Sequence, residues 1–167
     1  MPRQLLGSAA WITMWRERVA LFSRLNWPVA LLWVIVIVIE IVMYAETFVA
    51  APLSLIALAI PLAMINGCGE ELLWRGMYVH LFPRNIWLAM VYLSFGFALW
   101  HLAPQIIFPA ESVIEFVVAT LWLGLAYGVI AYRTGAVTWP ALAHSLSGIV
   151  ALSGFLAPSL LVLIANI

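Results

Sequence analysis

The sequence contains no lysine and no aspartate, and its only cysteine is Cys68. A single cysteine excludes an internal disulfide and a CxxC metal or redox site. Only 8% of the residues are charged, whereas soluble globular domains carry about 25% charged residues. The formal net charge is zero, so the chain lacks the basic surface with which nucleic-acid-binding domains contact phosphates. The composition therefore argues against an ordinary soluble domain and against a nucleic-acid partner.

Hydrophobic residues make up 66% of the chain. They form recurring apolar runs of about 20 residues, each long enough to cross the hydrocarbon core of a bilayer as a helix. Transmembrane β-strands instead alternate apolar and polar residues over about 10 positions, and runs such as VALLWVIVIVIEIV do not alternate. We therefore predict an all-α, polytopic transmembrane helical bundle with about six membrane segments, integral to a lipid bilayer.

The chain divides into a part expected on the membrane surface and a part expected to span it, with domain bounds at 1–26 and 27–167. Residues 5–25 place apolar side chains at helical spacing and three arginines between them, which predicts an amphipathic helix in the membrane interface. The predicted spans then cover an apolar stretch from Glu46 to Asn66, the segment 69–83, and about 28–45, 86–105, 113–132, 137–152 and 154–166. The last two are separated only by Ser153 and Gly154.

Arginines and glutamates gather at opposite ends of these predicted spans. The arginine ends carry Arg16, Arg18, Arg24, Arg84 and Arg133, and the opposite ends carry Glu46 and Glu111. Because positively charged loops stay in the cytoplasm, we expect the N-terminus and both arginine turns to be cytoplasmic.

Glu70, Glu71 and Arg75 form a charged group inside an apolar region, in the stretch NGCGEELLWRGMY. A charged side chain at the bilayer centre costs about 2.5–3.5 kcal/mol even on insertion scales, so these residues must pair or face a polar cavity. Glu71 and Arg75 are four positions apart and would share a helix face. Such a pair can be a structural tie between helices or part of a functional site. Glu40, in the first span, is expected to face the cavity or to pair near Arg75.

Two histidines in apolar runs, FGFALWHLAP and WPALAHSLSG, are predicted to lie at the same depth as Glu70. Glu70 lies roughly 21 Å before the turn at Arg84, and His101 lies roughly 24 Å after it, at the rise of a helix. His144 lies roughly 16 Å from its nearest predicted turn. A lone histidine in an apolar span is more often a satisfied core residue than a catalyst. The convergence of three spans at one layer predicts a shared polar site instead.

These motifs resemble those of the CPBP intramembrane proteases, the relatives of the CAAX prenyl-protein endopeptidase that include bacterial Abi proteins. EELLWR at 70–75 resembles the family's EExxxR motif, FALWH at 97–101 resembles FxxxH, and WPALAH ends on the histidine of a third motif. The resemblance covers about residues 60–150. It implies an intramembrane endopeptidase of the glutamic type, acting on a membrane-associated protein or peptide, in a bacterial inner membrane.

The resemblance also implies a role for each motif residue. Glu70 would be the general base that activates water, and Glu71 and Arg75 would hold its geometry and charge. His101 and His144 would orient the water or stabilise the oxyanion. No cofactor is expected because HExxH is absent, although two histidines and a glutamate could also hold zinc as three protein ligands.

The chain departs from the family pattern at Gly148, where the third motif carries asparagine or a similar polar residue. Ser147, Ser145 or Asn66 could supply the missing oxyanion donor, and helical spacing favours Ser147. Without a replacement, the chain would be a catalytically impaired membrane scaffold or immunity-type protein of the same fold. A small transporter with a proton relay is disfavoured because no internal repeat is visible.

Overall fold

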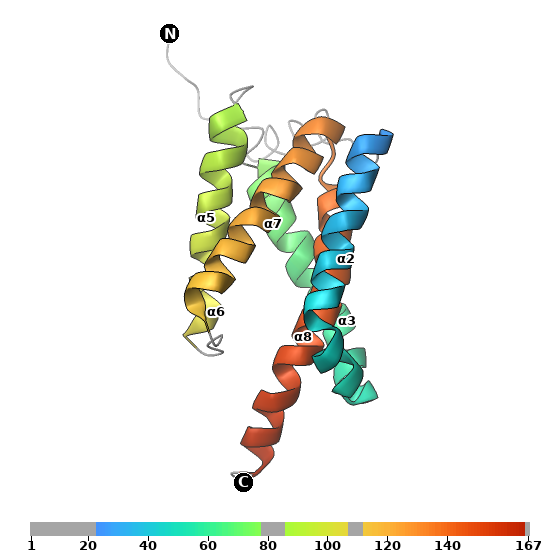
Figure 1. The fold of residues 1–167 in the computed structure, drawn as a ribbon, viewed down its shortest axis with the longest axis vertical. Coiled ribbons are helices and arrows are strands. Elements are labelled where there is room, and N and C mark those ends of the chain that lie inside the picture. The colour runs from blue at the N-terminus through green and yellow to red at the C-terminus, as the bar shows by residue number, and fades with distance from the viewer. Residues whose placement is uncertain (1–22, 78–85, 107–111, 166–167) are drawn as a thin grey trace, which may run out of the picture.

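The computed structural model describes residues 23–77, 86–106 and 112–165. Most of the predicted surface helix at 5–25, and the predicted turn at 83–85, lie outside this part of the chain. Within it, every regular element is a helix (Figure 1). The elements are α2 (Trp27–Ala50), α3 (Leu53–Glu71), η1 (Leu72–Met77), η2 (Trp87–Tyr92), α5 (Leu93–Trp100), α6 (Leu102–Gln105), α7 (Val113–Thr134) and α8 (Thr138–Ala165), with π-helical turns at η1 and η2.

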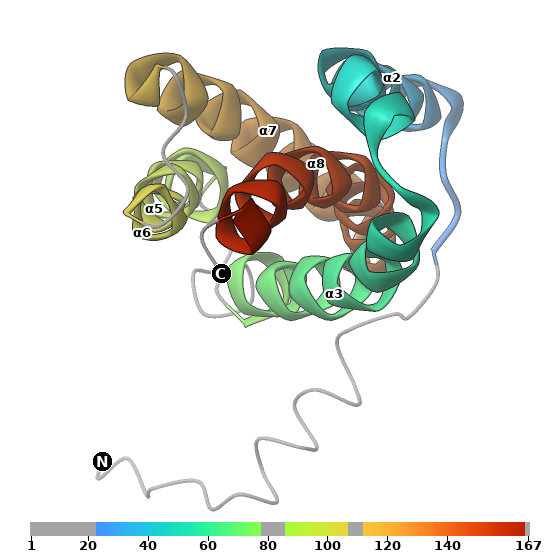
Figure 2. The same cartoon turned by 90° about the horizontal axis from the view of Figure 1, so that it is seen from below.

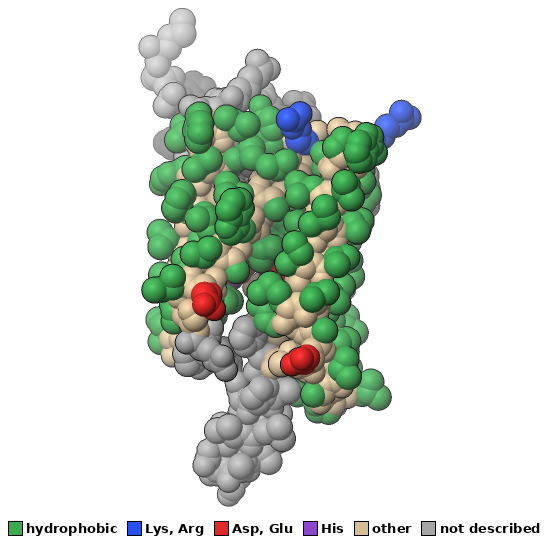
Figure 3. Space-filling view, viewed as in Figure 1, with side chains coloured by type: hydrophobic (Ala, Val, Ile, Leu, Met, Phe, Trp, Pro, Cys, Tyr) green, Lys and Arg blue, Asp and Glu red, His purple; other side chains and the backbone are tan. Residues whose placement is uncertain are grey.

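Three helical stretches of the described residues are long and apolar enough to cross a membrane: Trp27–Ala50, Leu53–Gly76 and Val113–Thr134. Large hydrophobic side chains are exposed along all three stretches, and the space-filling view shows them over the face that α2 and α7 form (Figure 3). Apolar cover of this extent suits lipid as the surrounding solvent. The chain is thus an integral membrane protein that is helical throughout its described elements, while the total of six segments stays a prediction.

Local sequence signals set the ends of the long helices. The Asn26 side chain accepts a hydrogen bond from the backbone N–H of Val29 at 3.2 Å and caps the start of α2. This helix ends at Ala51, which is extended because the following Pro52 disfavours helical backbone. Helix α7 ends at Gly135, whose φ of 66° is the left-handed conformation that glycine adopts freely. The turn predicted at 133–135 is therefore confirmed.

The predicted break at Ser153 and Gly154 is wrong, because α8 runs without interruption from Thr138 to Ala165. The Ser153 hydroxyl donates to the carbonyl oxygen of Ile149 at 2.7 Å, so its polar group is satisfied inside the helix. Gly154 lies so close to Thr47 of α2 that any side chain there would collide. Glycine marks a close helix contact at this position, and its helix penalty of about 1 kcal/mol does not break α8. The predicted span 86–105 is instead interrupted at His101, by a turn between α5 and α6.

Helix α8 lies in the middle of the bundle, with α3 on one side and α2 on the other (Figure 2). Its contact with α3 is built from small residues. Ala59, Ala63 and Gly67 recur every fourth position on α3 and are buried, which lets the two backbones approach closely. A Cβ atom added to Gly67 would lie 2.7 Å from the Ser145 hydroxyl oxygen and 2.8 Å from its backbone nitrogen. This close approach determines which residues of α8 face the end of α3.

We expect Gly67→Ala to destabilise the protein, because backbone atoms of Ser145 cannot move aside cheaply. Overpacking of this kind typically costs about 1–3 kcal/mol. Gly69→Ala is the matched control, since a Cβ there would meet nothing within 4 Å. Thermal unfolding in detergent should show a lower Tm for Gly67→Ala than for Gly69→Ala. Equal Tm values for the two variants would rule out the small-residue contact.

Candidate active site

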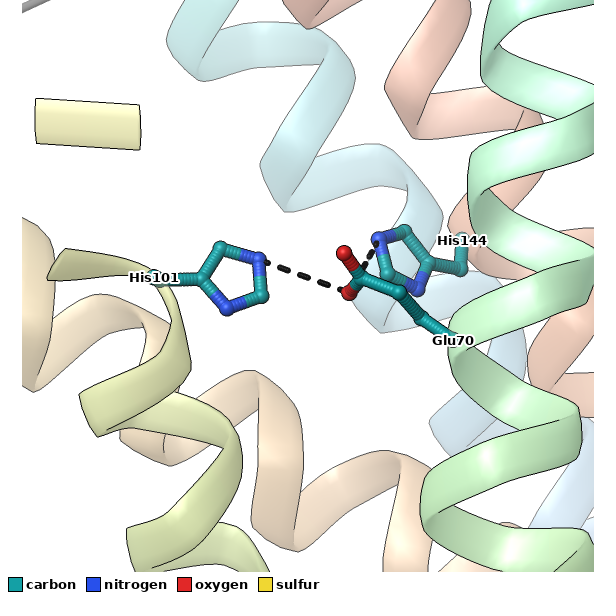
Figure 4. A group of neighbouring side chains, drawn as sticks. All are labelled: Glu70, His101 and His144. Atoms are coloured by element: carbon teal, nitrogen blue, oxygen red, sulfur yellow. Dashed lines mark ion pairs between the residues drawn. The ribbon is translucent and has the colours of Figure 1, made fainter. Parts of the chain in front are cut away.

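Three polar side chains from distant parts of the chain converge at the centre of the bundle (Figure 4). Glu70 comes from the end of α3, His101 from the turn between α5 and α6, and His144 from α8. The Oε2 atom of Glu70 lies 3.8 Å from Nε2 of His101 and 4.0 Å from Nε2 of His144. All three side chains are largely shielded, with exposed fractions between 12% and 16%. The structure therefore brings together the glutamate and both histidines that the sequence placed at one depth.

Glu71 and Arg75 form a buried ion pair, as their helical spacing predicted. Nη1 of Arg75 donates to Oε1 of Glu71 at 2.8 Å, and the same Glu71 oxygen lies 3.0 Å from Nδ1 of His144. Nη2 of Arg75 donates to the backbone carbonyl of Gly124 in α7 at 2.9 Å, and the guanidinium lies over the Phe97 ring at 4.4 Å. Arg75 lies in the π-helical turn η1, a type of helix irregularity that is frequent at functional sites. The pair thus fixes the His144 ring and ties η1 to α7.

The contacts of the two histidines determine which ring nitrogen faces the centre. Nδ1 of His101 lies 2.9 Å from the Phe97 carbonyl oxygen. Because this oxygen can only accept, Nδ1 carries the proton. Nδ1 of His144 donates to the Glu71 carboxylate in the same way. In its neutral form, each ring therefore presents an unprotonated Nε2 toward Glu70.

Glu70 is held on one side only. Its Oε1 atom accepts a hydrogen bond from the Trp100 indole N–H at 3.2 Å. Its Oε2 atom has no hydrogen-bond partner among the described residues, although it is buried. Trp100 was not predicted as a site residue, and its only sequence signal is its place directly before His101. With both rings neutral, three acceptors therefore meet at one point. A water molecule there could donate to two of them, and a cation could bind all three.

Asn66, Ser147 and Gly148 line the same cavity as Glu70 and the histidines, and the cavity has a volume of about 280 Å³. Asn66 lies one helical turn before Glu70. The Ser147 hydroxyl donates to the backbone carbonyl of Ala143 at 2.9 Å. Ser145 does not line this cavity, since it lies between α3 and α8 against Gly67. Of the polar candidates for an oxyanion donor, Asn66 and Ser147 thus reach the cavity and Ser145 does not.

Gly148 has a packing reason to lack a side chain. A Cβ atom there would lie 3.2 Å from the Cβ of Ala63 on α3, a tighter approach than side chains ordinarily make. A side chain at this position would therefore require Ala63 to move by a few tenths of an ångström.

Glu40 also reaches the cavity, from α2. Its carboxylate oxygens lie 3.0 and 3.1 Å from the Tyr127 hydroxyl of α7. The expectation that Glu40 faces the cavity is met, and it is hydrogen-bonded to Tyr127 rather than paired with Arg75. No sequence pattern predicted this contact, because the two residues lie 87 positions apart.

The Glu70, His101 and His144 donors could also hold a metal ion, since one ligand atom from each lies within 4.8 Å of the others. Two imidazoles and a carboxylate are a donor set that catalytic zinc uses. Tetrahedral zinc with ligands at about 2.0–2.1 Å would bring these atoms to about 3.4 Å from one another. The Glu70 oxygen lies 3.8 and 4.0 Å from the two histidine nitrogens, and all three ligand atoms lie within 4.8 Å of one another, so these side chains would have to move closer together to hold zinc.

Comparison with protein-family models matches residues 26–150 to the Rce1-like model, described as type II CAAX prenyl endopeptidase Rce1-like. The match covers most of the chain and includes Glu70, His101 and His144. No curated protein and no solved structure gave a match.

Proposed function

Because the chain belongs to the Rce1-like type II CAAX prenyl endopeptidase family, we propose that it is an intramembrane endopeptidase that cleaves membrane-associated proteins or peptides. The observation that carries this proposal is the convergence of Glu70, His101 and His144 in a cavity walled by membrane-spanning helices.

The proposed nucleophile is a water molecule bound between Glu70 and the two histidines. Oε2 of Glu70 and an Nε2 atom accept its two protons as hydrogen bonds, so its free lone pair points at the substrate. The water oxygen attacks the carbonyl carbon while Glu70 takes one proton as general base. The C–N bond then breaks, and Glu70 delivers the proton to the leaving amine. The Trp100 indole N–H supports this role, because it donates a hydrogen bond to Oε1 of Glu70 and leaves Oε2 to act as the base.

We assign the oxyanion donor to the Asn66 side-chain amide. Asn66 shares a helix face with Glu70 and lines the same cavity, whereas the Ser147 hydrogen is taken by the Ala143 carbonyl. The amide donates to the negatively charged oxygen that develops during attack, which is the contribution expected of the missing third-motif asparagine. The structure thus favours Asn66 over Ser147, which helical spacing alone had favoured.

Asn66→Ala should lower kcat about 10²–10³-fold, the usual effect of losing one oxyanion donor. Ser147→Ala should leave kcat nearly unchanged, because the Ser147 hydroxyl donates to a backbone carbonyl of its own helix. The measurement is cleavage of a membrane-anchored peptide library by the protein reconstituted in liposomes, with products identified by mass spectrometry. If Ser147→Ala lost activity and Asn66→Ala kept it, the donor assignment would be reversed.

A catalytically impaired scaffold or immunity-type protein of the same fold is the second candidate, and Gly148 is the observation that favours it. However, the close contact of Gly148 with Ala63 is a packing reason for glycine at this position. Asn66 also offers an amide in place of the third-motif asparagine. We therefore rank the endopeptidase first. A cellular phenotype that survives Glu70→Gln, together with no cleavage by the unaltered protein, would reverse this order.

The proposed topology places the N-terminus in the cytoplasm of a bacterial inner-membrane protein with about six membrane segments. Among the described residues, exposed arginines lie at one end of the bundle and exposed glutamates toward the other (Figure 3). These are Arg24, Arg133, Glu46 and Glu115. The positive-inside rule supports the orientation. The remaining predicted markers, Arg16, Arg18, Arg84 and Glu111, lie outside the described residues.

A further inference from the structure

Glu40 is a second acidic group in the cavity, and the proposed mechanism does not use it. It lies in the apolar interior of α2, is only 6% exposed, and belongs to none of the three motifs. A carboxylate at such a depth carries an insertion cost of about 2.5–3.5 kcal/mol and is a functional candidate for that reason.

The hydrogen bonds of Glu40 leave much of its acceptor capacity unused. Both carboxylate oxygens lie near the same Tyr127 hydroxyl, at 3.0 and 3.1 Å, and one hydroxyl has only one proton to donate. An ionised carboxylate can accept about four hydrogen bonds. Ser147 also forms a side-chain hydrogen bond with Glu40, and its hydroxyl oxygen lies 3.5 Å from the Tyr127 hydroxyl oxygen, so these two hydroxyl groups occupy part of this capacity. The remaining acceptor sites of Glu40 are therefore available to whatever enters the cavity.

Within the described chain, no arginine forms an ion pair with Glu40. Arg75 is held by Glu71 and the Gly124 carbonyl, while Arg24 and Arg133 are exposed at the end of the bundle. The Tyr127 ring stacks on His144, with centroids 5.5 Å apart and planes 21° apart, so the carboxylate is fixed beside the catalytic group. A positively charged side chain of the substrate could form an ion pair with this carboxylate.

Glu40 also lies where the cavity adjoins an outer groove. That groove, about 350 Å³ in volume, is almost wholly apolar and is formed by α2 and α7. Glu40, Tyr44, Phe116, Thr120 and Leu123 line both spaces. A peptide that follows the groove toward Glu70 would pass the Glu40 carboxylate.

We propose that Glu40 binds a basic side chain of the substrate, arginine or lysine, close to the cleaved bond. This inference rests on the proposed endopeptidase activity and narrows its substrate class. Glu40 and Glu70 line the same cavity of about 280 Å³, which places the basic residue near the bond that Glu70 acts on. Charge-assisted hydrogen bonds between a cation and a shielded carboxylate are strong and geometrically selective.

The test is a membrane-anchored peptide library with randomised residues beside the cleavable region, presented to the reconstituted protein. The unaltered protein should cleave peptides with arginine or lysine near the cut in preference to peptides with methionine there. Glu40→Gln, which still accepts from Tyr127, should lose this preference by about 30-fold, as expected when one partner of a buried charge pair is removed. Glu46→Gln, on the same helix but exposed, should keep the preference.

Cleavage without any preference for basic residues in the unaltered protein would overturn the inference, whether or not Glu40→Gln folds. Absence of any cleavage would instead count against the endopeptidase activity. A binding experiment then tests the Glu40 subsite without any need for cleavage. The same library is incubated with the Glu70→Gln protein and with the Glu70→Gln, Glu40→Gln double variant, both in nanodiscs, and the captured peptides are identified. Enrichment of basic peptides that needs Glu40 supports the subsite, and equal capture by both proteins refutes it.

Discussion

Glu70→Gln is expected to abolish peptide hydrolysis while leaving the fold intact. The amide has nearly the same shape, and its oxygen can still accept the hydrogen bond from the Trp100 indole. It cannot take a proton from water, so the general base is lost. General-base catalysis typically contributes about 10²–10⁴-fold, and we expect kcat to fall by at least that range. The measurement is cleavage of the peptide library by the reconstituted variant, alongside its Tm in detergent.

Glu115→Gln is the matched control, because Glu115 is exposed in the first turn of α7. It should retain full activity. Glu70→Gln would also remove a zinc ligand, so a second measurement separates the two mechanisms. Activity that persists in 1,10-phenanthroline, in protein without bound zinc, supports the metal-free mechanism. Retained hydrolysis in Glu70→Gln would be incompatible with either role for this carboxylate.

Arg75→Ala is expected to cause the largest loss of stability of any single change in the site. Arg75 is 3% exposed and its partner Glu71 is fully buried, so the substitution leaves a carboxylate without its counter-charge. Removing one partner of a buried ion pair costs about 3–5 kcal/mol. The same change removes the hydrogen bond to the Gly124 carbonyl. It also removes the arginine that holds the Glu71 carboxylate in place against His144. Thermal unfolding in detergent should show a large drop in Tm.

Arg75→Lys should fall between the unaltered protein and Arg75→Ala. Lysine keeps the charge near Glu71, but it lacks the planar fork that reaches Glu71 and Gly124 together and stacks on Phe97. Arg133→Ala is the control, since Arg133 is exposed at the end of α7 and surface charges contribute little to stability. An unchanged Tm for Arg75→Ala would show that the pair does not hold the helices together.

The sequence by itself determined the class of protein and predicted most residues of the candidate site. Low charge and long apolar runs require helices in lipid, because only helices satisfy every backbone hydrogen bond within such a run. Charged residues and histidines inside those runs are costly, so their positions along the spans already predicted a shared layer. The Glu71–Arg75 pair followed from helical spacing alone, since residues four apart are neighbours on a helix.

Only the tertiary structure decided which way these side chains point and which helices meet. Periodicity does not fix the rotation of one helix against another, which depends on the small residues where α3 and α8 cross. That crossing places Gly148 against Ala63 and Ser145 against Gly67, while Asn66 is an exposed residue that lines the cavity. The partnership of Glu40 with Tyr127 joins residues 87 positions apart, and no local pattern encodes it. The α8 break was mispredicted for the same reason: the glycine that resembled a turn signal is a contact point for α2, which only packing reveals.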